Sequence, residues 1–143
     1  MRLRAISIGI VLIAACASTS DAAVRISRDH GGQIGPYLYA FSVIRQSGER
    51  VIIDGPCLSA CTLVLAVLPR ERICVTRRAQ LGFHAAWSPD EDGRLVVNRP
   101  GTKIVLGIYP PPVRNRIIRN GGLGRKMIFL QGRELASMYP TCQ

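Results

Sequence analysis

The sequence has few acidic residues, only two histidines and, beyond its first residues, no long hydrophobic run. The absence of such a run excludes a later membrane-spanning helix. There are 19 lysine and arginine residues against 9 acidic ones, a net charge of +10. These cations are scattered rather than clustered with aromatic side chains, so we expect no specific nucleic-acid partner. We interpret the basic surface as one that faces an anionic envelope.

Cysteine spacing argues against a metal centre. Cys57 and Cys61 are four residues apart, and no second close pair exists, so the sequence fits no zinc template. Cys74 and Cys142 complete an even set in the body of the chain. In an oxidising compartment four cysteines indicate two disulfides, for which three connectivities exist. We expect disulfides, no metal and no cofactor.

The N-terminus has the composition of an export signal. A short basic start is followed by an apolar stretch over residues 5–17, which is too short to span a bilayer. We therefore predict a signal peptide over residues 1–23 and an exported, periplasmic domain over residues 24–143. The alternative is a lipoprotein, because residues 13–16 resemble a lipobox that would make Cys16 the lipidated N-terminus.

The body of the chain alternates short apolar runs with segments that suit helices, which predicts an α/β fold. Strands are expected at residues 24–27, 51–53, 73–75 and 81–84. A helix is expected around Pro36, with Gly48 as its C-terminal cap, and a buried helix over residues 59–68. This order describes two consecutive βαβ units and a mainly parallel sheet, with ligand sites at the carboxyl ends of its strands.

The C-terminal part is predicted to be less regular. Residues 88–101 suggest a surface loop or loose hairpin, and residues 109–112 a stiff proline-rich connector. Residues 113–120 suit a short helix. Two short helical turns are expected at residues 126–130 and 134–138.

Ser59 lies where the second predicted helix begins, directly after a buried strand. The N–H groups of a first helical turn have no helical partner, and the helix dipole favours negative charge there. A serine nucleophile needs such surroundings because its attack creates an oxyanion, and it needs a base within hydrogen-bond reach. His84 ends a later strand and can return to the same edge, whereas His30 suits a turn.

Two alternatives to this Ser59–His84 dyad remain. Ser59 could be a plain helix N-cap, and the surrounding motif is not a G-x-S-x-G elbow because Cys57 and Cys61 occupy both glycine positions. Either cysteine could be a nucleophile only as a free thiolate, which oxidation would remove.

Residues 51–84, VIIDGPCLSACTLVLAVLPRERICVTRRAQLGFH, resemble the catalytic core of the Clp protease proteolytic subunit and its crotonase-like superfamily. The motifs G-P-C-x-S-A-C at residues 55–61 and L-G-F-H at residues 81–84 are more similar still to a group of bacterial periplasmic Clp-like proteins with unassigned activity. The resemblance implies a Clp/crotonase-like fold of repeated βαβ units with short C-terminal helices. It also implies that Ser59 is the nucleophile and His84 the base.

The resemblance implies further site residues. Residues 29–34, DHGGQI, look like the family's S-P-G-G turn, which would make the N–H of Gly32 one oxyanion donor and the N–H of Ala60 the other. By the family fold, the last residues lie beside the strand that holds Cys74. This implies the disulfide pairs Cys74–Cys142 and Cys57–Cys61.

The chain also departs from the family pattern. The proteases use an aspartate as a third catalytic residue, and Met127 stands near that position. Asp90, Asp92 or Glu134 would have to substitute for it. Clp-like domains often assemble into rings or trimers, which implies a homo-oligomer, but the usual assembly segment is not recognisable in this sequence.

Two hypotheses for function follow. The first is an exported serine hydrolase that acts on peptide or acyl bonds through a Ser59–His84 dyad. The second is a non-catalytic Clp-like envelope protein that binds a partner or an anionic envelope polymer through its basic face.

Overall fold

The computed structural model of the protein describes residues 22–143. The predicted signal peptide lies outside these residues except for its last two positions, and so does the lipobox cysteine, Cys16. Within the described part, no helix combines the length and the apolar character that are needed to cross a membrane.

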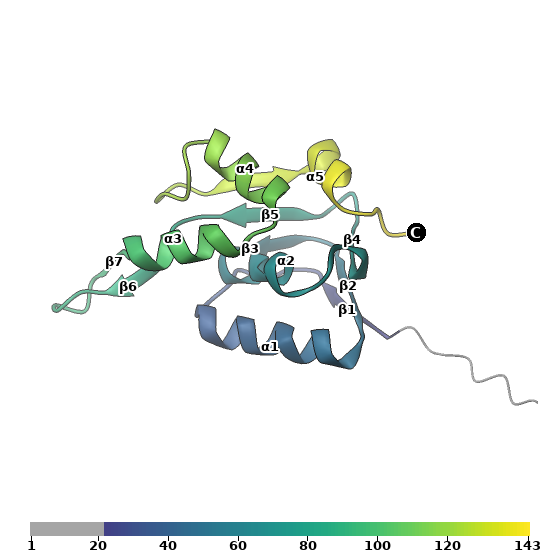
Figure 1. The fold of residues 1–143 in the computed structure, drawn as a ribbon, viewed down its shortest axis with the longest axis horizontal. Coiled ribbons are helices and arrows are strands. Elements are labelled where there is room, and N and C mark those ends of the chain that lie inside the picture. Colours follow the sequence, from purple (N-terminus) through teal and green to yellow (C-terminus); the bar gives the residue numbers. More distant parts are fainter. Residues whose placement is uncertain (1–21) are drawn as a thin grey trace, which may run out of the picture.

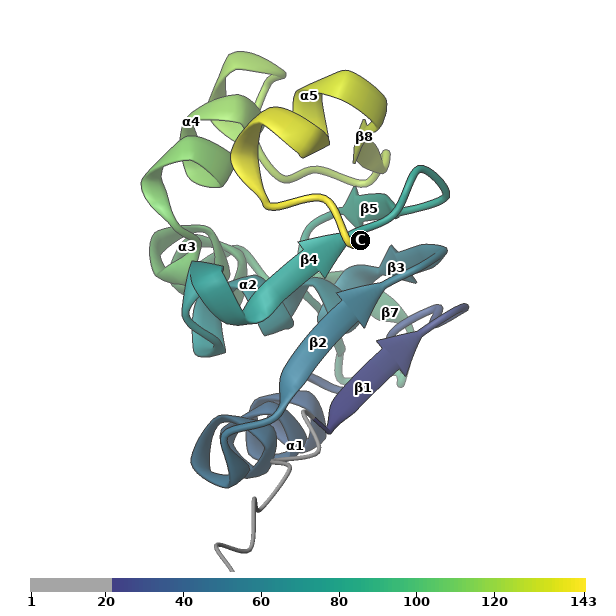
Figure 2. The same cartoon turned by 90° about the vertical axis from the view of Figure 1, so that its right-hand side faces the viewer.

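A first sheet contains three parallel strands in the order β1-β2-β4. They are β1 (Ala23–Ile26), β2 (Arg50–Ile53) and β4 (Ile73–Val75). Helix α1 (Ile34–Ser47) connects β1 to β2, and the 3-10 helix η1 (Ser59–Leu63) runs into α2 (Val64–Val67) before β4. The helices α1 and α2 lie together on one side of this sheet (Figure 2). Both predicted βαβ units are therefore confirmed.

A second sheet positions the candidate site. It has the order β3-β5-β8, with β3 (Pro56–Leu58) parallel to β5 (Gln80–Phe83) and β8 (Ile128–Gln131) antiparallel to it. The hairpin of β6 (Trp87–Pro89) and β7 (Leu95–Val97) extends from the body (Figure 1). Of the two alternatives that the sequence left for this segment, a surface loop or a loose hairpin, the structure has the hairpin. The separate short strand β3 was not predicted.

The helical turn predicted at residues 126–130 is wrong, because strand β8 occupies this segment. Leu130 pairs with Leu81 and is 1% exposed, while its neighbour Phe129 faces solvent. This alternation of buried and exposed side chains is that of a strand at the edge of a sheet. Pairing with β5 therefore determines the structure of a segment whose local sequence suggested a helix.

Three further helices follow the hairpin: α3 (Arg99–Ile108), α4 (Pro111–Arg119) and α5 (Gly132–Met138). The sequence did not predict α3, whose N-cap is Asn98. The side-chain oxygen of Asn98 accepts a hydrogen bond from the N–H of Gly101 at 2.8 Å. The prolines expected to form a connector instead begin α4, because proline suits the first helical turn. In Figure 1, α4 and α5 lie at the opposite end of the molecule from α1, and α3 lies between them. The single-turn helix η2 (Arg70–Arg72) comes directly before β4.

One hydrophobic core joins both sheets and the helices around them. Its largest fully buried side chains come from the strands β2, β4 and β5 and from the helices η1, α4 and α5, among other elements, and include Ile53, Ile73, Leu81, Phe83, Leu63, Ile117 and Leu135. The fold is α/β with a mainly parallel sheet arrangement and short C-terminal helices, as the sequence predicts.

Buried Asp54 links the end of β2 to the turn before β5. Its carboxylate accepts hydrogen bonds from Arg25 at 2.8 Å, from the Thr76 hydroxyl at 2.7 Å and from the Arg78 guanidinium. The hydrogen bond from Arg78, followed by that from Thr76, lowers the pKa of Asp54 well below its usual range although burial opposes the shift. This ionic cluster fixes the start of the strand that leads to His84.

Both disulfides implied by the resemblance are present. The Cys57–Cys61 bond joins Cα atoms 5.3 Å apart, and the Cys74–Cys142 bond joins Cα atoms 5.0 Å apart. The C-terminal residues run beside β4, where the N–H of Val75 donates to the Pro140 carbonyl at 2.9 Å. The last segment therefore lies next to the strand that holds Cys74.

Candidate active site

Ser59 lies at the sharp turn between β3 and η1. Its φ angle is 55°, and it is the only non-glycine residue with positive φ in residues 22–143. Such a conformation costs about 1–3 kcal/mol and persists only where the surrounding structure enforces it. The N-cap of η1 is Leu58, which has extended backbone, so Ser59 is not the plain helix cap that its sequence position allowed.

The Gly31 turn packs directly against Ser59. A Cβ added at Gly31 would lie 2.5 Å from the carbonyl oxygen of Leu58 and 2.6 Å from the Cβ of Ser59. Gly31 also has a φ angle of 79°, which favours glycine. Only glycine therefore allows this close approach. The family resemblance pointed to Gly32 as a site residue and gave no role to Gly31.

Asp29 holds the Gly31 turn in place. Its Oδ1 accepts hydrogen bonds from the N–H of Gly31 at 2.8 Å and from the Tyr37 hydroxyl at 2.6 Å. Its backbone pairs with β3, since its carbonyl accepts from the N–H of Leu58 at 2.9 Å. Burial, followed by the hydrogen bond to Asp29, raises the pKa of Tyr37 to about 12, so the phenol keeps its proton.

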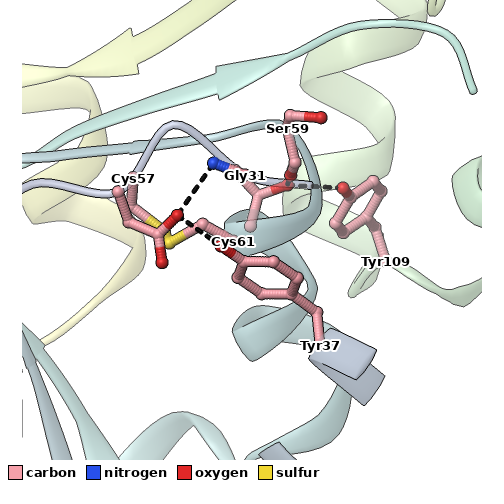
Figure 3. The surroundings of a disulfide bond; sticks show 8 residues. Gly31, Tyr37, Cys57, Ser59, Cys61 and Tyr109 are labelled. Atoms are coloured by element: carbon pink, nitrogen blue, oxygen red, sulfur yellow. Dashed lines mark hydrogen bonds between the residues drawn. A yellow bond between two sulfur atoms is a disulfide. The ribbon is translucent and has the colours of Figure 1, made fainter. Parts of the chain in front are cut away.

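The Cys57–Cys61 disulfide brackets Ser59 in the sequence, and both cysteines are fully buried. Figure 3 shows the disulfide, the Gly31 turn and Ser59 around the same bend of the chain. A covalent link on the inner side and a glycine turn beside it therefore both restrain the position of Ser59.

Thr62 and Tyr109 restrain the same turn from the core. The Thr62 hydroxyl donates to the carbonyl oxygen of Ser59 at 2.6 Å. Because its proton is used there, it accepts from the Tyr109 hydroxyl, also at 2.6 Å (Figure 3). Burial raises the pKa of Tyr109 to about 12, which keeps this donor protonated. No sequence signal marked this pair, which is separated by 47 residues.

A cavity of about 420 Å³ opens beside this turn. Ser59, His84, Gly32 and Ala60, the four site residues predicted from the sequence, all line it. The remaining wall is mostly apolar and comes from α1, η1, the hairpin and the α3 region; its larger side chains are Ile34, Leu63, Trp87, Leu95, Val105 and Tyr109. The chain thus brings a serine and a histidine to one mostly apolar cavity.

His84 follows the end of β5 and is half-buried. Its Nδ1 lies 2.6 Å from the carbonyl oxygen of Ala85 and 3.1 Å from the indole Nε1 of Trp87. The Trp87 ring in turn lies under Arg125, whose guanidinium carbon is 5.7 Å from the ring centroid. His84 therefore enters the cavity with its Nδ1 side held by a backbone carbonyl and an aromatic neighbour.

A carboxylate partner for His84 is absent from the cavity lining. Met127 packs against Gly82 of β5, where an added Cβ would meet its Sδ atom. Of the proposed substitutes, Asp90 and Asp92 are bonded within the hairpin, and Glu134 pairs with Arg116. None of these three lines the cavity.

The part of the chain that the structure describes contains no group of three or more His, Cys, Asp or Glu side chains that could hold a metal ion. His30 is exposed and does not line the cavity. The cavity lining contains Ser59 and His84 together with the polar side chain of Gln33, and no acidic residue.

No protein-family model matches the chain, and no curated protein matches it. Among solved structures, the chain is similar to a mutant of ClpP1 from Listeria monocytogenes, with 14% sequence identity and a TM-score of 0.46. The match covers 83% of this chain and 71% of that chain. At this identity and TM-score, the likeness says nothing about the chemistry of this chain.

Proposed function

We propose that the protein is a serine hydrolase in which Ser59 attacks the carbonyl carbon of a peptide or acyl substrate and His84 acts as the base. The observation that carries this proposal is the backbone of Ser59, with a φ angle of 55° in a turn that lines the same cavity as His84. Strained backbone of this kind is concentrated at functional sites, where the surrounding structure maintains it. The Gly31 turn and the buried disulfide supply that restraint.

The first half of the reaction uses Ser59 and His84 together. The Oγ of Ser59 forms a bond to the substrate carbonyl carbon while its proton passes to Nε2 of His84. The carbonyl oxygen becomes an oxyanion, to which the N–H groups of Gly32 and Ala60 would donate. The bond to the leaving group then breaks, and the leaving group takes the proton from His84.

The second half releases the acyl group. His84 takes a proton from water, and the resulting hydroxide adds to the acyl carbon. The bond to the Oγ of Ser59 breaks, and the serine recovers its proton from His84. The apolar walls of the cavity suit a substrate with an apolar group beside the scissile bond.

The two disulfides support an exported location for this activity, because such bonds persist in oxidising compartments. The periplasm predicted from the N-terminal sequence is such a compartment.

A second candidate function is a non-catalytic Clp-like protein that binds an envelope partner. The position of Met127 favours it, because no carboxylate is present where the related proteases carry one. The net charge of +10 suits an anionic partner.

A fluorophosphonate probe separates the two candidates, since it labels an activated serine. We expect labelling of the oxidised wild-type protein, with the adduct on the peptide that contains Ser59. Ser59→Ala should abolish the labelling and His84→Gln should slow it strongly, whereas Ser137→Ala, on an exposed part of α5, should leave it unchanged. A folded, oxidised protein that takes no label, or a Ser59→Ala protein that labels like the wild type, would contradict the hydrolase.

A further inference from the structure

Nδ1 of His84 faces two groups that require opposite protonation states of the ring. The Ala85 carbonyl oxygen, at 2.6 Å, can only accept, so this contact requires a proton on Nδ1. The indole N–H of Trp87, at 3.1 Å, can only donate, so this contact requires a lone pair on Nδ1. A neutral histidine can satisfy one of these contacts at a time.

The two tautomers differ in their value to the proposed reaction, on which this inference rests. With the proton on Nδ1, the Nε2 atom has a free lone pair and can accept the proton of Ser59. With the proton on Nε2, the ring cannot act as a base at that atom. Whether Nδ1 bonds to the Ala85 carbonyl or to the Trp87 indole therefore determines whether Nε2 can accept the proton of Ser59.

We propose that the backbone carbonyl of Ala85 takes the place of the missing carboxylate, and that the indole N–H of Trp87 opposes it. Ala85 holds the competent tautomer of His84, and Trp87 holds the other. The balance between the two sets the fraction of molecules that are ready to react.

The Ala85 carbonyl belongs to a peptide unit that the fold holds firmly. The N–H of the same peptide, that of Ala86, donates to the Thr102 hydroxyl at 3.0 Å. Thr102 is itself fixed, since its hydroxyl donates to the carbonyl of Asn98 at 2.7 Å. The N–H of Ala85 donates to the Gly124 carbonyl at 2.9 Å. Thr102 is therefore a positioning residue that acts through the Ala85–Ala86 peptide.

The Trp87 indole also has close neighbours in the structure. The rings of His84 and Trp87 are 6.4 Å apart between centroids and inclined by 60°. Arg125 lies over the face of the indole, where a cation is attracted to the ring. Trp87→Phe would keep an aromatic ring at this position and remove the N–H donor.

Nitrogen NMR of the histidine rings tests the proposal directly. The protein has one tryptophan, so the indole signal of Trp87 is unique, and a His30→Gln variant identifies which of the two sets of histidine signals belongs to His84. Long-range ¹H–¹⁵N correlation at a pH where the rings are neutral gives the ratio of the two tautomers. His30, which is exposed, serves as an internal control.

Two variants should move this ratio in opposite directions. Trp87→Phe should shift His84 toward the Nδ1–H tautomer by about two- to tenfold, the value of one hydrogen bond. Thr102→Val, which removes the acceptor that fixes the peptide, should shift it toward the Nε2–H tautomer. Turnover of an acyl ester should rise in the first variant and fall in the second, while His30 is unaffected in both.

General damage to the fold would lower turnover in both variants, so the expected rise in Trp87→Phe distinguishes the proposal from such damage. A tautomer ratio that Trp87→Phe leaves unchanged, or shifts toward Nε2–H, would overturn the proposal. The NMR ratio is measured without turnover, so a protein that shifts as expected but hydrolyses nothing would contradict the proposed function and leave this inference standing.

Discussion

The two disulfides lie in different regions of the molecule: one in the turn at Ser59, the other at the C-terminal end of the chain. Cys57–Cys61 closes a loop of only four residues in sequence, is fully buried, and surrounds the strained turn at Ser59. Cys74–Cys142 joins residues 68 apart and ties the end of the chain to an outer strand of the parallel sheet. The first bond constrains the local shape of the candidate site, and the second constrains the chain as a whole.

This difference has an energetic consequence. A disulfide stabilises a protein mainly by restricting the unfolded chain, and its effect grows with the length of the loop that it closes. The long disulfide should therefore dominate stability, whereas the short one should matter more for the geometry of Ser59. Stability and activity can then be separated by removing one bond at a time.

The largest loss of stability is expected when the long disulfide is removed. Cys74→Ala/Cys142→Ala should lower the free energy of unfolding by about 4 kcal/mol, from the loop entropy of a separation of 68 residues. Urea unfolding followed by circular dichroism measures this change. A loss of unfolding free energy smaller than that of Cys57→Ala/Cys61→Ala would contradict the claim that the long disulfide contributes more to stability than the short one.

The next largest effect is expected at Gly31, because the turn at Ser59 depends on packing as well as on its disulfide. Gly31→Ala should destabilise the protein by about 3 kcal/mol, since its Cβ would meet Leu58 and Ser59 and its φ angle is positive. Gly35→Ala is the matched control, with open space around its Cβ and a helical backbone in α1. Thermal unfolding should show the control at or slightly above the wild-type midpoint.

Removal of the short disulfide should cost less. Cys57→Ala/Cys61→Ala should lower the free energy of unfolding by about 2 kcal/mol, from its separation of four residues. The same urea experiment gives the value. An equal or greater loss than in the Cys74–Cys142 variant would show that local packing, and not chain entropy, governs the effect of both bonds.

The smallest effect on stability is expected from the ionic cluster of Asp54, which contains no residue of either disulfide. Its pKa is lowered in the folded state, so its contribution is present above the unfolded value of about 3.9 and is lost as the pH falls below it. Asp54→Asn should therefore lose stability at neutral pH and show a weaker further loss below about pH 4 than the wild type does. Asp92→Asn on the exposed hairpin is the control. Parallel acid-unfolding curves for the wild type and Asp54→Asn would contradict this role.

The sequence predicted the parallel part of the fold because each of its elements has a strong local signal. The apolar runs of β2 and β4, the glycine that ends α1 and the order of strands and helices all indicate βαβ units. Strand β8 has no such local signal. It is a strand because it pairs with β5, whose residues are about 50 positions away in the sequence. Helix α3 was missed because its first residues fall in the polar segment 88–101, which was predicted to be a surface loop or loose hairpin.

The sequence and the family resemblance named four residues that the structure places around one cavity, but they did not name the groups that hold those residues in place. The position of Ser59 after a buried strand and its interval to His84 were visible in the sequence. The positive φ angle of Ser59, the packing of Gly31 and the Ala85 carbonyl are properties of three-dimensional contact. A backbone carbonyl leaves no residue-specific trace in a sequence, so the partner of His84 could not have been found there.

The most direct test is the rate at which a fluorophosphonate labels Ser59 in three oxidised proteins, measured where all are folded. These are the wild type, Cys57→Ala/Cys61→Ala and Cys74→Ala/Cys142→Ala. If the short disulfide and the Gly31 turn hold Ser59 in a reactive position, only the first variant should label more slowly, by about tenfold for the roughly 1.4 kcal/mol of lost restraint. Equal labelling rates in the two variants, or a wild-type protein that takes no label at Ser59, would contradict the claim that the short disulfide and the Gly31 turn hold Ser59 in a reactive position.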